Sequence, residues 1–514
     1  MLVSPDIWYI HMSGSELATG IPQGNPAMQS TTIGLRVKNR RYIMRKTKVV
    51  CTIGPACENA ETLKEMCEAG MNVARLNFSH GSHEEHKHKI DLVKQVREEM
   101  KLPIAIMLDT KGPEYRIGTF ADHAVTVEEG AAFTFTTEDI VGDNTKVSVS
   151  YKDLMKNLES GDTVLVNNGL VIFEVVNVTE TEALCTVKNG GTLSDKKSMN
   201  FPGKVMKQDF LSETDKADIL FGIENDVDFI AASFVSTKED IQSLRYFLDD
   251  NGGREIEIIA KIENRSGVDH IDEICEIADG VMVARGDLGV EIPGIEVPSV
   301  QKYLIQKCRL LGKRVITATE MLESMIHNPR PTRAEISDVA NAVYDGTSAV
   351  MLSGETAAGS FPVEAVKTMV ETVRFTENQI HYDKRFKETE FIIRNNQDAV
   401  SHATCAMAID VQAKCIVVNS LTGLTARMVS RFRCPIDIIG MTASKKAWRK
   451  INLSWGVTPV LCSRYASMDQ MFESDLAQAK KLLSLQPGDN IVMTGGQLTG
   501  SAGNTNMIKV EQIS

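Results

Sequence analysis

The stretch Lys48-Val49-Val50-Cys51-Thr52-Ile53 opens the pattern that decides the fold. It is a short apolar run rich in β-branched residues, which is typical of a buried strand, and a segment with helical periodicity follows it. The same unit recurs along the chain, with apolar runs at 49–53, 72–76, 104–108, 228–234, 256–262, 280–284, 314–317 and 349–352. Eight such strands alternating with helices predict an α/β fold, a closed (β/α)8 TIM barrel.

Three motifs predict where connecting helices begin. The pairs are Ser82 with Glu85, Thr332 with Glu335 and, in a shorter form, Ser212 with Asp215. Each has the spacing of a capping box, in which two side chains bond the backbone N–H groups that the first helical turn leaves free.

The interval between the third and fourth runs is much longer than a helical connection needs. Residues 116–202 contain strand-like segments at 124–127, 132–136, 146–149, 163–166, 170–176 and 183–187, separated by glycine and asparagine turns. The pattern predicts a β-rich lid domain inserted into a barrel loop. Because barrel active sites lie at the carboxyl ends of the strands, we expect the lid to exclude water from that face; a passive insertion is the alternative.

The two ends of the chain lie outside the barrel pattern. Residues 386–514 combine strand-like runs at 415–418, 436–439, 490–493 and 507–510 with helical segments at 399–413 and 468–485, which predicts a separate C-terminal α/β domain. The catalytic barrel then comprises 45–115 and 203–385. Residues 1–44 are rich in Gly, Ser, Pro and Asn before a basic stretch, and we expect a disordered N-terminal extension that does not resemble a signal peptide.

Composition limits the partners of this protein. The 514 residues include 68 acidic and 56 basic ones, a net charge of -12, so we expect neither nucleic acid nor a membrane as a partner. No apolar run is long enough for a transmembrane helix. The ten cysteines are scattered and form no C-x-x-C pair, so we interpret them as reduced, small apolar residues of a cytoplasmic protein.

Polar residues follow the strand-like runs at the positions where a barrel carries its chemistry. In chain order they are Arg75, Asn77, Ser79, Asp109, Thr110, Lys111, Ser233, Lys261, Glu263, Arg285, Gly286, Asp287, Thr319, Ser353 and Glu355. One polar strand end is ordinary, but so many on one rim predict an active site.

The rim residues indicate two cation sites and one anion site. Glu263 and Asp287 follow neighbouring strands, and two carboxylates completed by water and substrate oxygens are typical of Mg²⁺. Arg75 and Lys261 add positive charge that suits a phosphorylated or carboxylated anion; a structural Lys261–Glu263 salt bridge is the alternative. A second cluster, Asn77, Ser79, Asp109 and Thr110, has one formal charge among several oxygens, which favours a monovalent cation.

Other motifs carry less weight. His83-Glu84-Glu85-His86 is one residue short of a zinc-binding H-E-x-x-H motif, and we expect His83, His86 and His88 to be solvated helix residues. The chain has no Walker P-loop, so a nucleotide would be held in another way. Loops 422–426 and 494–506 are rich in Gly, Ser and Thr, whose backbone amides can surround a phosphate.

Several of these segments closely resemble the pyruvate kinase family. They are Thr52-Ile53-Gly54-Pro55, Asn72-Val73-Ala74-Arg75-Leu76-Asn77-Phe78-Ser79-His80-Gly81, Leu108-Asp109-Thr110-Lys111-Gly112-Pro113-Glu114, Ala260-Lys261-Ile262-Glu263-Asn264, Ala284-Arg285-Gly286-Asp287-Leu288-Gly289 and Met351-Leu352-Ser353-Gly354-Glu355-Thr356. The resemblance covers about residues 45–514 and is most specific in the barrel.

The resemblance implies a phosphotransferase that converts phosphoenolpyruvate and ADP to pyruvate and ATP, the last step of glycolysis. Matching positions imply catalytic roles for Lys261, Arg75 and Thr319, substrate binding by these residues with Gly286 and Asp287, and Mg²⁺ ligation by Glu263 and Asp287. They also imply K⁺ at Asn77, Ser79, Asp109 and Thr110, and nucleotide contacts by Asn77, His80, Arg116 and Lys197. Family members that need K⁺ have Glu at the position of Glu114, whereas K⁺-independent members have Lys there, whose ammonium replaces the ion.

The resemblance also implies regulation and assembly. The family's effector loop matches Thr422-Gly423-Leu424-Thr425-Ala426, so a sugar-phosphate or nucleotide effector is expected at Ser420, Thr422 and Thr425, although the family's arginine is Leu424 here. A cytoplasmic homotetramer is implied too. Further departures are Glu320 for Gln, Ser236 for Arg, and Asn167-Asn168 for two lid aspartates.

Two other functions remain open from the sequence. A Mg²⁺-dependent lyase or aldolase would share the Lys261, Glu263 and Asp287 rim, but would have no use for the lid. A ligand-binding sensor without turnover is favoured by Glu320, Ser236 and the lid asparagines, and disfavoured by the intact charged rim.

Overall fold

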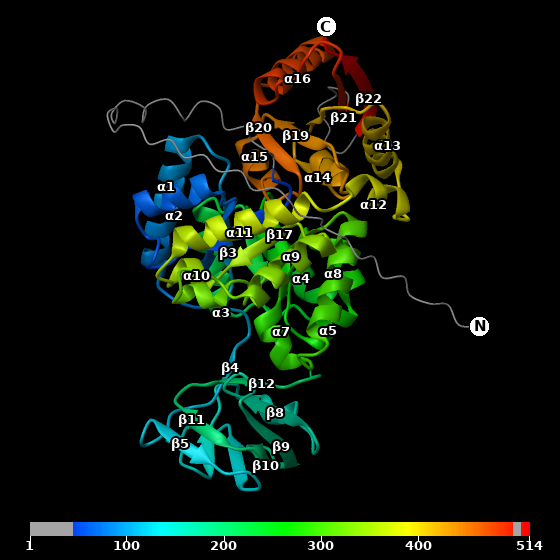
Figure 1. Ribbon diagram of the computed structural model, residues 1–514. Helices are drawn as coiled ribbons and strands as arrows, with labels where there is room; N and C mark the ends of the chain where they lie inside the picture. Colours follow the sequence, from blue (N-terminus) through cyan, green and yellow to red (C-terminus); the bar gives the residue numbers. More distant parts are fainter. Residues whose placement is uncertain (1–44, 205, 207, 497–504) are drawn as a thin grey trace, which may run out of the picture. The chain divides into compact units, whose positions relative to one another are not determined.

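Eight parallel strands form a closed barrel in the computed structural model, which describes residues 45–204, 206, 208–496 and 505–514 (Figure 1). The extension predicted at 1–44 lies outside these residues. The barrel strands are β1 (Lys48–Thr52), β2 (Val73–Asn77), β3 (Ala105–Asp109), β13 (Phe229–Ala232), β14 (Glu257–Ile262), β15 (Gly280–Ala284), β16 (Arg314–Ala318) and β17 (Ala349–Leu352). All eight predicted runs are therefore strands, and β1 closes the ring by pairing with both β2 and β17.

Side chains alternate between the two faces of each barrel strand, as the two-residue period of a strand requires. Val50, Met107 and Phe229 belong to the cluster inside the barrel, whereas Val49 and Cys51 pack outward in the larger cluster with the helices. The helices are α1 (Ala60–Ala69), α2 (His83–Met100), α3 (Glu213–Glu224), α4 (Lys238–Asp250), α5 (Arg265–Asp269), α6 (Ile271–Ile277), α7 (Arg285–Glu291), α8 (Val297–Leu311), α9 (Arg333–Asp345), α10 (Gly354–Ala357) and α11 (Pro362–Glu377). Figure 1 shows helices around the barrel strands.

The predicted helix starts are confirmed by their caps. Ser82, Ser212 and Thr332 each cap a helix through a capping box, at α2, α3 and α9. A fourth box, Thr237 with Asp240 at the start of α4, was not predicted. These caps satisfy backbone N–H groups that the first turn of a helix cannot bond internally.

The lid residues 116–202 form β structure with a core of their own. Their strands, together with β4 at the junction, are β4 (Tyr115–Arg116), β5 (Ala124–Val127), β6 (Ala132–Thr136), β7 (Lys146–Ser148), β8 (Thr163–Val166), β9 (Val171–Val178), β10 (Glu182–Asn189), β11 (Gly191–Ser194) and β12 (Ser198–Asn200). Seven make a mixed sheet, and β5 pairs with β11. Phe133, Phe135 and Phe173 pack together at its centre, with ring centroids 5.0 to 5.3 Å apart. The predicted β-rich segment is thus confirmed, with β4, β11 and β12 added.

The C-terminal segment forms an α/β layer structure. A five-stranded sheet has the order β20-β19-β18-β21-β22, in which β22 is antiparallel to β21. Its elements are α12 (Tyr382–Glu388), α13 (Asn396–Asp410), β18 (Cys415–Asn419), α14 (Leu424–Ser430), β19 (Asp437–Thr442), α15 (Lys445–Ile451), β20 (Val457–Leu461), α16 (Met468–Leu482), β21 (Asn490–Gly496) and β22 (Thr505–Gln512). Strand β20 was not predicted.

Buried polar contacts join this segment to the barrel. Arg449 on α15 donates from Nε to Oδ1 of Asp228 at 2.7 Å, and Asp228 is fully buried just before β13. Lys48 donates from Nζ to the carbonyl oxygen of Val457 at 2.7 Å. Removing either partner of a buried charged contact leaves the other without compensation, so these contacts define how the two parts pack.

All ten cysteines are free thiols in the structure, and all except Cys462 are buried within the hydrophobic clusters. Within the described ranges, no helix combines the length and apolar character needed to cross a bilayer.

Candidate active site

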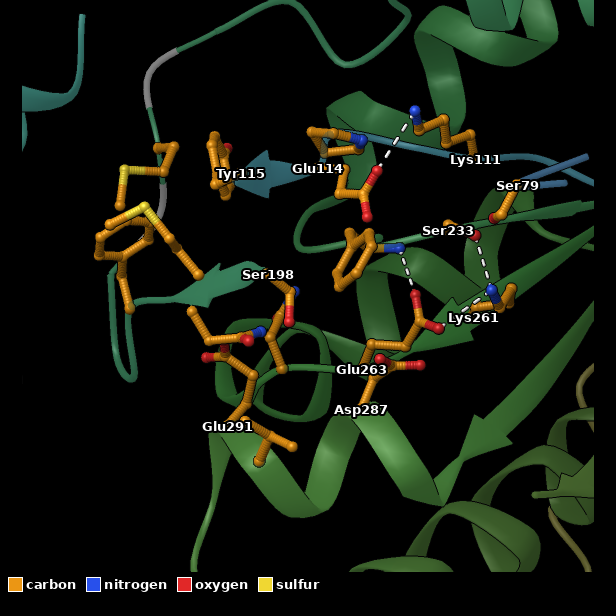
Figure 2. A pocket seen from close by; sticks show the side chains of 18 of the residues that line it. Ser79, Lys111, Glu114, Tyr115, Ser198, Ser233, Lys261, Glu263, Asp287 and Glu291 are labelled. Carbon is orange, nitrogen blue, oxygen red and sulfur yellow. Dashed lines mark hydrogen bonds and ion pairs between the residues drawn. The ribbon is translucent and has the colours of Figure 1, made fainter. Parts of the chain in front are cut away.

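A pocket of about 450 Å³ lies at the carboxyl ends of the barrel strands. Its barrel side includes Arg75, Asn77, Ser79, Ser233, Lys261, Glu263 and Asp287, and its lid side includes Arg116, Asn167, Asn168, Lys197 and Ser198. Figure 2 shows Lys261, Glu263 and Asp287 on one side of this space, with Ser198 across from them. The pocket brings together most of the rim residues that the sequence predicts.

Lys261 lies at the centre of a buried charged network. Its Nζ is 2.9 Å from Oδ1 of Asp109, 3.0 Å from Oε1 of Glu263 and 2.6 Å from Oγ of Ser233. Burial disfavours the ammonium, but Asp109 and Glu263 outweigh it and raise the pKa of Lys261 above its ordinary value. The lysine is therefore a fixed positive charge in the pocket wall and cannot act as a neutral base.

Arg75 shares the same carboxylate. Its Nε donates to Oδ2 of Asp109 at 2.6 Å, and its Nη1 donates to Oγ1 of Thr52 at 2.9 Å. Burial alone would raise the pKa of Asp109, but Arg75 and Lys261 hold it below its ordinary value. One buried aspartate thus orients two cations at the pocket wall, where their positive charge can face an anion.

Glu263 and Asp287 fit a divalent cation. Oε2 of Glu263 accepts the backbone N–H of Phe234 at 2.6 Å, whereas its buried Oε1 receives no well-directed hydrogen bond although Lys261 lies near it. Burial raises the pKa of Glu263 to about 7, against the attraction of Lys261 and with the help of Asp287. A buried carboxylate oxygen that accepts no well-directed hydrogen bond, beside a second carboxylate, is an arrangement that a hard cation stabilises.

Gly286 and Thr319 meet on the next two strand ends. The backbone N–H of Gly286 donates to Oγ1 of Thr319 at 2.8 Å. Thr319 and Glu320 both have a left-handed backbone conformation, with φ of 67° and 54°, which residues other than glycine adopt rarely. Such strain is concentrated at functional sites, where surrounding contacts hold it. Glu320 is exposed, and Thr319 is not part of the pocket wall in this structure.

The four predicted monovalent-cation ligands divide into two pairs. Asn77 and Ser79 line the pocket, and the side chain of Asn77 accepts the backbone N–H of Ser79 at 3.2 Å. Asp109 and Thr110 are buried behind it, and the hydroxyl of Thr110 accepts the backbone N–H of Ser233 at 3.1 Å. Both oxygens of Asp109 already face Arg75 and Lys261.

The lid contributes cations from its first and last strands. Arg116 on β4 and Lys197 just before β12 both line the pocket, and β4 pairs with β12 through Ser198 and Arg116. Glu114 forms ion pairs with Arg116 and with Lys111, the latter at 3.2 Å. These pairs hold the pKa of Glu114 below its ordinary value, against partial burial. The asparagines that replace the family's aspartates, Asn167 and Asn168, also reach this pocket.

The histidine run is only partly solvated, so the expectation of three solvated side chains is wrong for His86. This ring is 2% exposed, stacks on Phe78 with centroids 3.9 Å apart, and bonds the carbonyl oxygen of His80 at 2.8 Å. His83 contacts Asp218 at 2.6 Å. His80 itself is exposed and outside the pocket wall, and the described residues contain no cluster of three or more His, Cys, Asp or Glu suited to a metal.

The candidate effector loop is ordered by its own hydroxyl groups. Oγ of Ser420 accepts the backbone N–H groups of Gly423 at 3.0 Å and Thr425 at 3.3 Å. The hydroxyl of Thr425 lies 2.7 Å from that of Thr505 and is buried, whereas Thr422 is exposed. Part of the second predicted phosphate loop, 497–504, lies outside the described residues.

Sequence reasoning did not identify Glu291, Asn200 or Tyr115 as part of this pocket. Glu291 had a signal, because it is one helical turn after Asp287 and so lies on the same face of α7. Asn200 and Tyr115 had none, since only the tertiary arrangement brings the ends of the lid to the barrel.

Two family models match the chain: the pyruvate kinase barrel domain over residues 44–366 and the pyruvate kinase alpha/beta domain over residues 398–511. Pyruvate kinase of Clostridium acetobutylicum is 46% identical over 472 residues, which span 91% of this chain and 100% of that protein. Pyruvate kinase of Geobacillus stearothermophilus is 46% identical over 476 residues, 91% of this chain and 81% of that protein. The crystal structure of a pyruvate kinase from Cryptosporidium parvum is similar with a TM-score of 0.87 and 37% identity, over 91% of this chain and 96% of the other.

The barrel and the charged pocket at its strand ends thus define a protein of the TIM-barrel class with a candidate active site. The matches extend over both the barrel and the C-terminal segment. The chain belongs to the pyruvate kinase family and is a transferase. Its reaction is phosphoryl transfer from phosphoenolpyruvate to ADP, a step of glycolysis.

Proposed function

We propose that the pocket performs this transfer with Lys261 and Arg75 as the cations that stabilise the phosphoryl group in flight. The observation that carries the proposal is the buried Lys261 ammonium, held charged by Asp109 and Glu263 in the pocket wall. Phosphoryl transfer needs positioning and neutralisation of charge more than covalent chemistry. A permanently charged lysine beside an arginine supplies both without a proton transfer of its own.

Glu263 and Asp287 are the proposed ligands of Mg²⁺. The buried Oε1 of Glu263 receives no well-directed hydrogen bond, and burial raises the pKa of this carboxyl. Both support the proposal, because a bound cation would stabilise the buried carboxylate. When bound, the metal would polarise substrate oxygens and neutralise developing negative charge. Glu263 is held in place for this role by the backbone N–H of Phe234.

Gly286, Asp287 and Thr319 are proposed to contact the substrate. Thr319 is assigned to the face where the enolate receives its proton, and its bond to the N–H of Gly286 supports a shared role. Its left-handed backbone is consistent with a position held for function.

The nucleotide is proposed to contact Asn77, His80, Arg116 and Lys197, with a second Mg²⁺ carried by ADP. The support is the position of Arg116 and Lys197 on the lid side of the pocket, where their charges suit a polyphosphate.

A K⁺ ion is proposed at Asn77, Ser79, Asp109 and Thr110. Glu114 supports this proposal, because a Lys ammonium at its position would replace the ion. Replacing K⁺ salts by Tris in the assay is expected to lower kcat strongly, with recovery on adding KCl but not an equal concentration of NaCl. Full activity without K⁺ would remove the ion from the proposal.

The C-terminal segment is proposed to bind a phosphorylated effector through Ser420, Thr422 and Thr425. The exposed hydroxyl of Thr422 and the backbone amides of this turn suit a phosphate. A cytoplasmic homotetramer completes the proposal, and the free thiols are consistent with a reducing compartment.

The direct test is a coupled pyruvate-release assay with phosphoenolpyruvate, ADP, Mg²⁺ and K⁺, run on the parent and on Glu263→Gln. We expect turnover in the parent and a large loss in the variant, with weaker binding of Mn²⁺ used as a spectroscopic substitute. Phosphoenolpyruvate binding by the parent without turnover would instead indicate a sensor. Unchanged Mn²⁺ affinity in the variant would remove Glu263 from the metal site.

A further inference from the structure

The last residue of α7 joins the barrel to the lid. Oε1 of Glu291 accepts a hydrogen bond from Nδ2 of Asn200 at 3.1 Å, and the carboxylate also accepts the backbone N–H of Phe201. Both donors lie where the lid returns to the barrel, at the end of β12. In Figure 2 Glu291 lies on the Asp287 side of the pocket, below Ser198 of the lid strand.

Glu291 is unfavourable for the helix that carries it. A carboxylate in the last turn of a helix faces the negative end of the helix dipole. Asp287 stands four residues earlier on the same face, so the two like charges repel each other. Partial burial and then Asp287 raise the pKa of Glu291, against the two hydrogen bonds to the lid. The stabilisation of this side chain therefore comes from the lid and not from α7.

The anchored strand β12 lies next to both lid cations. Lys197 immediately precedes β12, and Arg116 pairs with Ser198 across β4 and β12. Both cations line the pocket, so the direction in which β12 enters the barrel determines where they lie. A hydrogen bond at the end of a three-residue strand restricts that direction strongly, because the chain has little length over which to bend.

A lid turn also approaches the same turn of α7. Gly169, in the lid turn that follows Asn168, stands next to Val290, whose Cγ1 is 3.6 Å from the position that a Cβ on Gly169 would take. Asn168 in turn accepts the hydroxyl of Ser198 at 3.2 Å. The turn and the strand thus reach α7 together.

We propose that Glu291 is a positioning residue that latches lid strand β12 onto α7, so that Lys197 and Arg116 stand over the nucleotide side of the pocket. The inference rests on the proposed function for the role of these two cations. Because α7 also carries Gly286 and Asp287, one short helix positions the substrate side and the lid side of the reaction. In this arrangement Glu291 acts through Asn200.

The test compares Glu291→Ala and Asn200→Ala with Glu364→Ala, a control at an exposed acidic position in the first turn of α11. Amide hydrogen exchange of segment 196–203 is measured in the full chain without substrates. We expect at least about tenfold faster exchange in both latch variants, since a hydrogen bond to a charged acceptor is lost. In the assay, KM for ADP should rise by about tenfold while KM for phosphoenolpyruvate stays within twofold.

Glu291→Gln retains one acceptor oxygen, so it should lie between the parent and Glu291→Ala. The double variant should exchange no faster than Glu291→Ala, because Asn200→Ala removes a contact that Glu291→Ala already removes. Each of four results would refute this role of Glu291. They are unchanged hydrogen exchange of segment 196–203, an unchanged KM for ADP, a Glu291→Gln variant that behaves like Glu291→Ala, and additive effects of the two alanine substitutions. A parent without turnover would refute the proposed function instead, while the exchange measurement would still test the latch.

Discussion

Replacing Lys261 by methionine removes the charge from which the whole rim network is organised. The side chain is 10% exposed and contacts Asp109, Glu263 and Ser233 at 2.6 to 3.0 Å. Methionine fills a similar volume, so the loss is electrostatic. Asp109 then keeps Arg75 as a partner, whereas Glu263 loses the ammonium beside it. Breaking buried pairs in this way costs about 3–5 kcal/mol of unfolding free energy. Loss of a cation from the transferring phosphoryl group should lower kcat by about 10³- to 10⁵-fold.

The pH dependence provides a second check on the same variant. Burial already raises the pKa of Glu263 to about 7, and without Lys261 it should rise further. Protonation of Glu263 removes its uncompensated charge. The loss of unfolding free energy in the variant should therefore be largest above pH 7 and should shrink as the pH falls through the pKa of Glu263.

The assay is coupled pyruvate release, with thermal and urea unfolding measured on the same preparations. Lys261→Arg keeps the charge and should retain most of the stability but little activity, because the planar guanidinium cannot place its charge where the compact ammonium lies. Lys238→Met is the matched control, since Lys238 makes an exposed pair with Glu276 that contributes little. A Lys261→Met enzyme within tenfold of the parent, or one equally stable at pH 8, would refute the reasoning.

Three further changes test other parts of the molecule. Burial raises the pKa of Asp475 to about 7 although Asn419 donates a hydrogen bond to it, so between pH 4 and 7 the folded chain keeps a proton that the unfolded chain releases. The unfolding free energy therefore falls as the pH rises through this range. Asp475→Asn should remove this pH dependence, which is on the order of 4 kcal/mol over the full range, in urea titrations at several pH values. Arg449→Ala leaves Asp228 fully buried without its closest partner and should lower the unfolding free energy by about 3 kcal/mol in the same assay, and a loss below 1 kcal/mol would contradict the role of this contact. Phe173→Ala empties the centre of the lid core and should destabilise the lid by about 3–5 kcal/mol, seen as faster hydrogen exchange in 116–202 while the barrel strands remain protected.

The barrel strands were predictable because each is buried on both faces and therefore reads as a continuous apolar run. Strand β20 was not, because it lies at the edge of its sheet and contains Pro459, which cannot donate a ladder hydrogen bond. Strand β12 has only three residues, Ser198–Asn200, and no pattern can be recognised over that length. Short and edge strands depend on tertiary pairing more than on their own composition.

The strand ends that form the site were predictable from the sequence, but the contacts between their side chains were not. Barrel anatomy places the polar rim residues together, and the pocket contains most of them. That Asp109 bonds both Arg75 and Lys261 depends on the register of the barrel and on side-chain directions, which a linear sequence does not contain. The burial of His86 had a usable signal, because His86, Ile90 and Val93 share the inward face of α2.

The closure of the barrel determines the order in which this chain can fold as it leaves a ribosome. Lys48 pairs with Ala349, so the first strand lacks one neighbour until nearly the whole barrel has been synthesised. The segment 116–202 closes its sheet and its aromatic core from residues within itself, and it emerges long before that. Such local contacts form early, whereas the distant pairing of β1 with β17 is slow and leaves apolar strands uncovered meanwhile. During translation the lid should therefore be the first native part of the chain, and the unclosed barrel the part most exposed to aggregation.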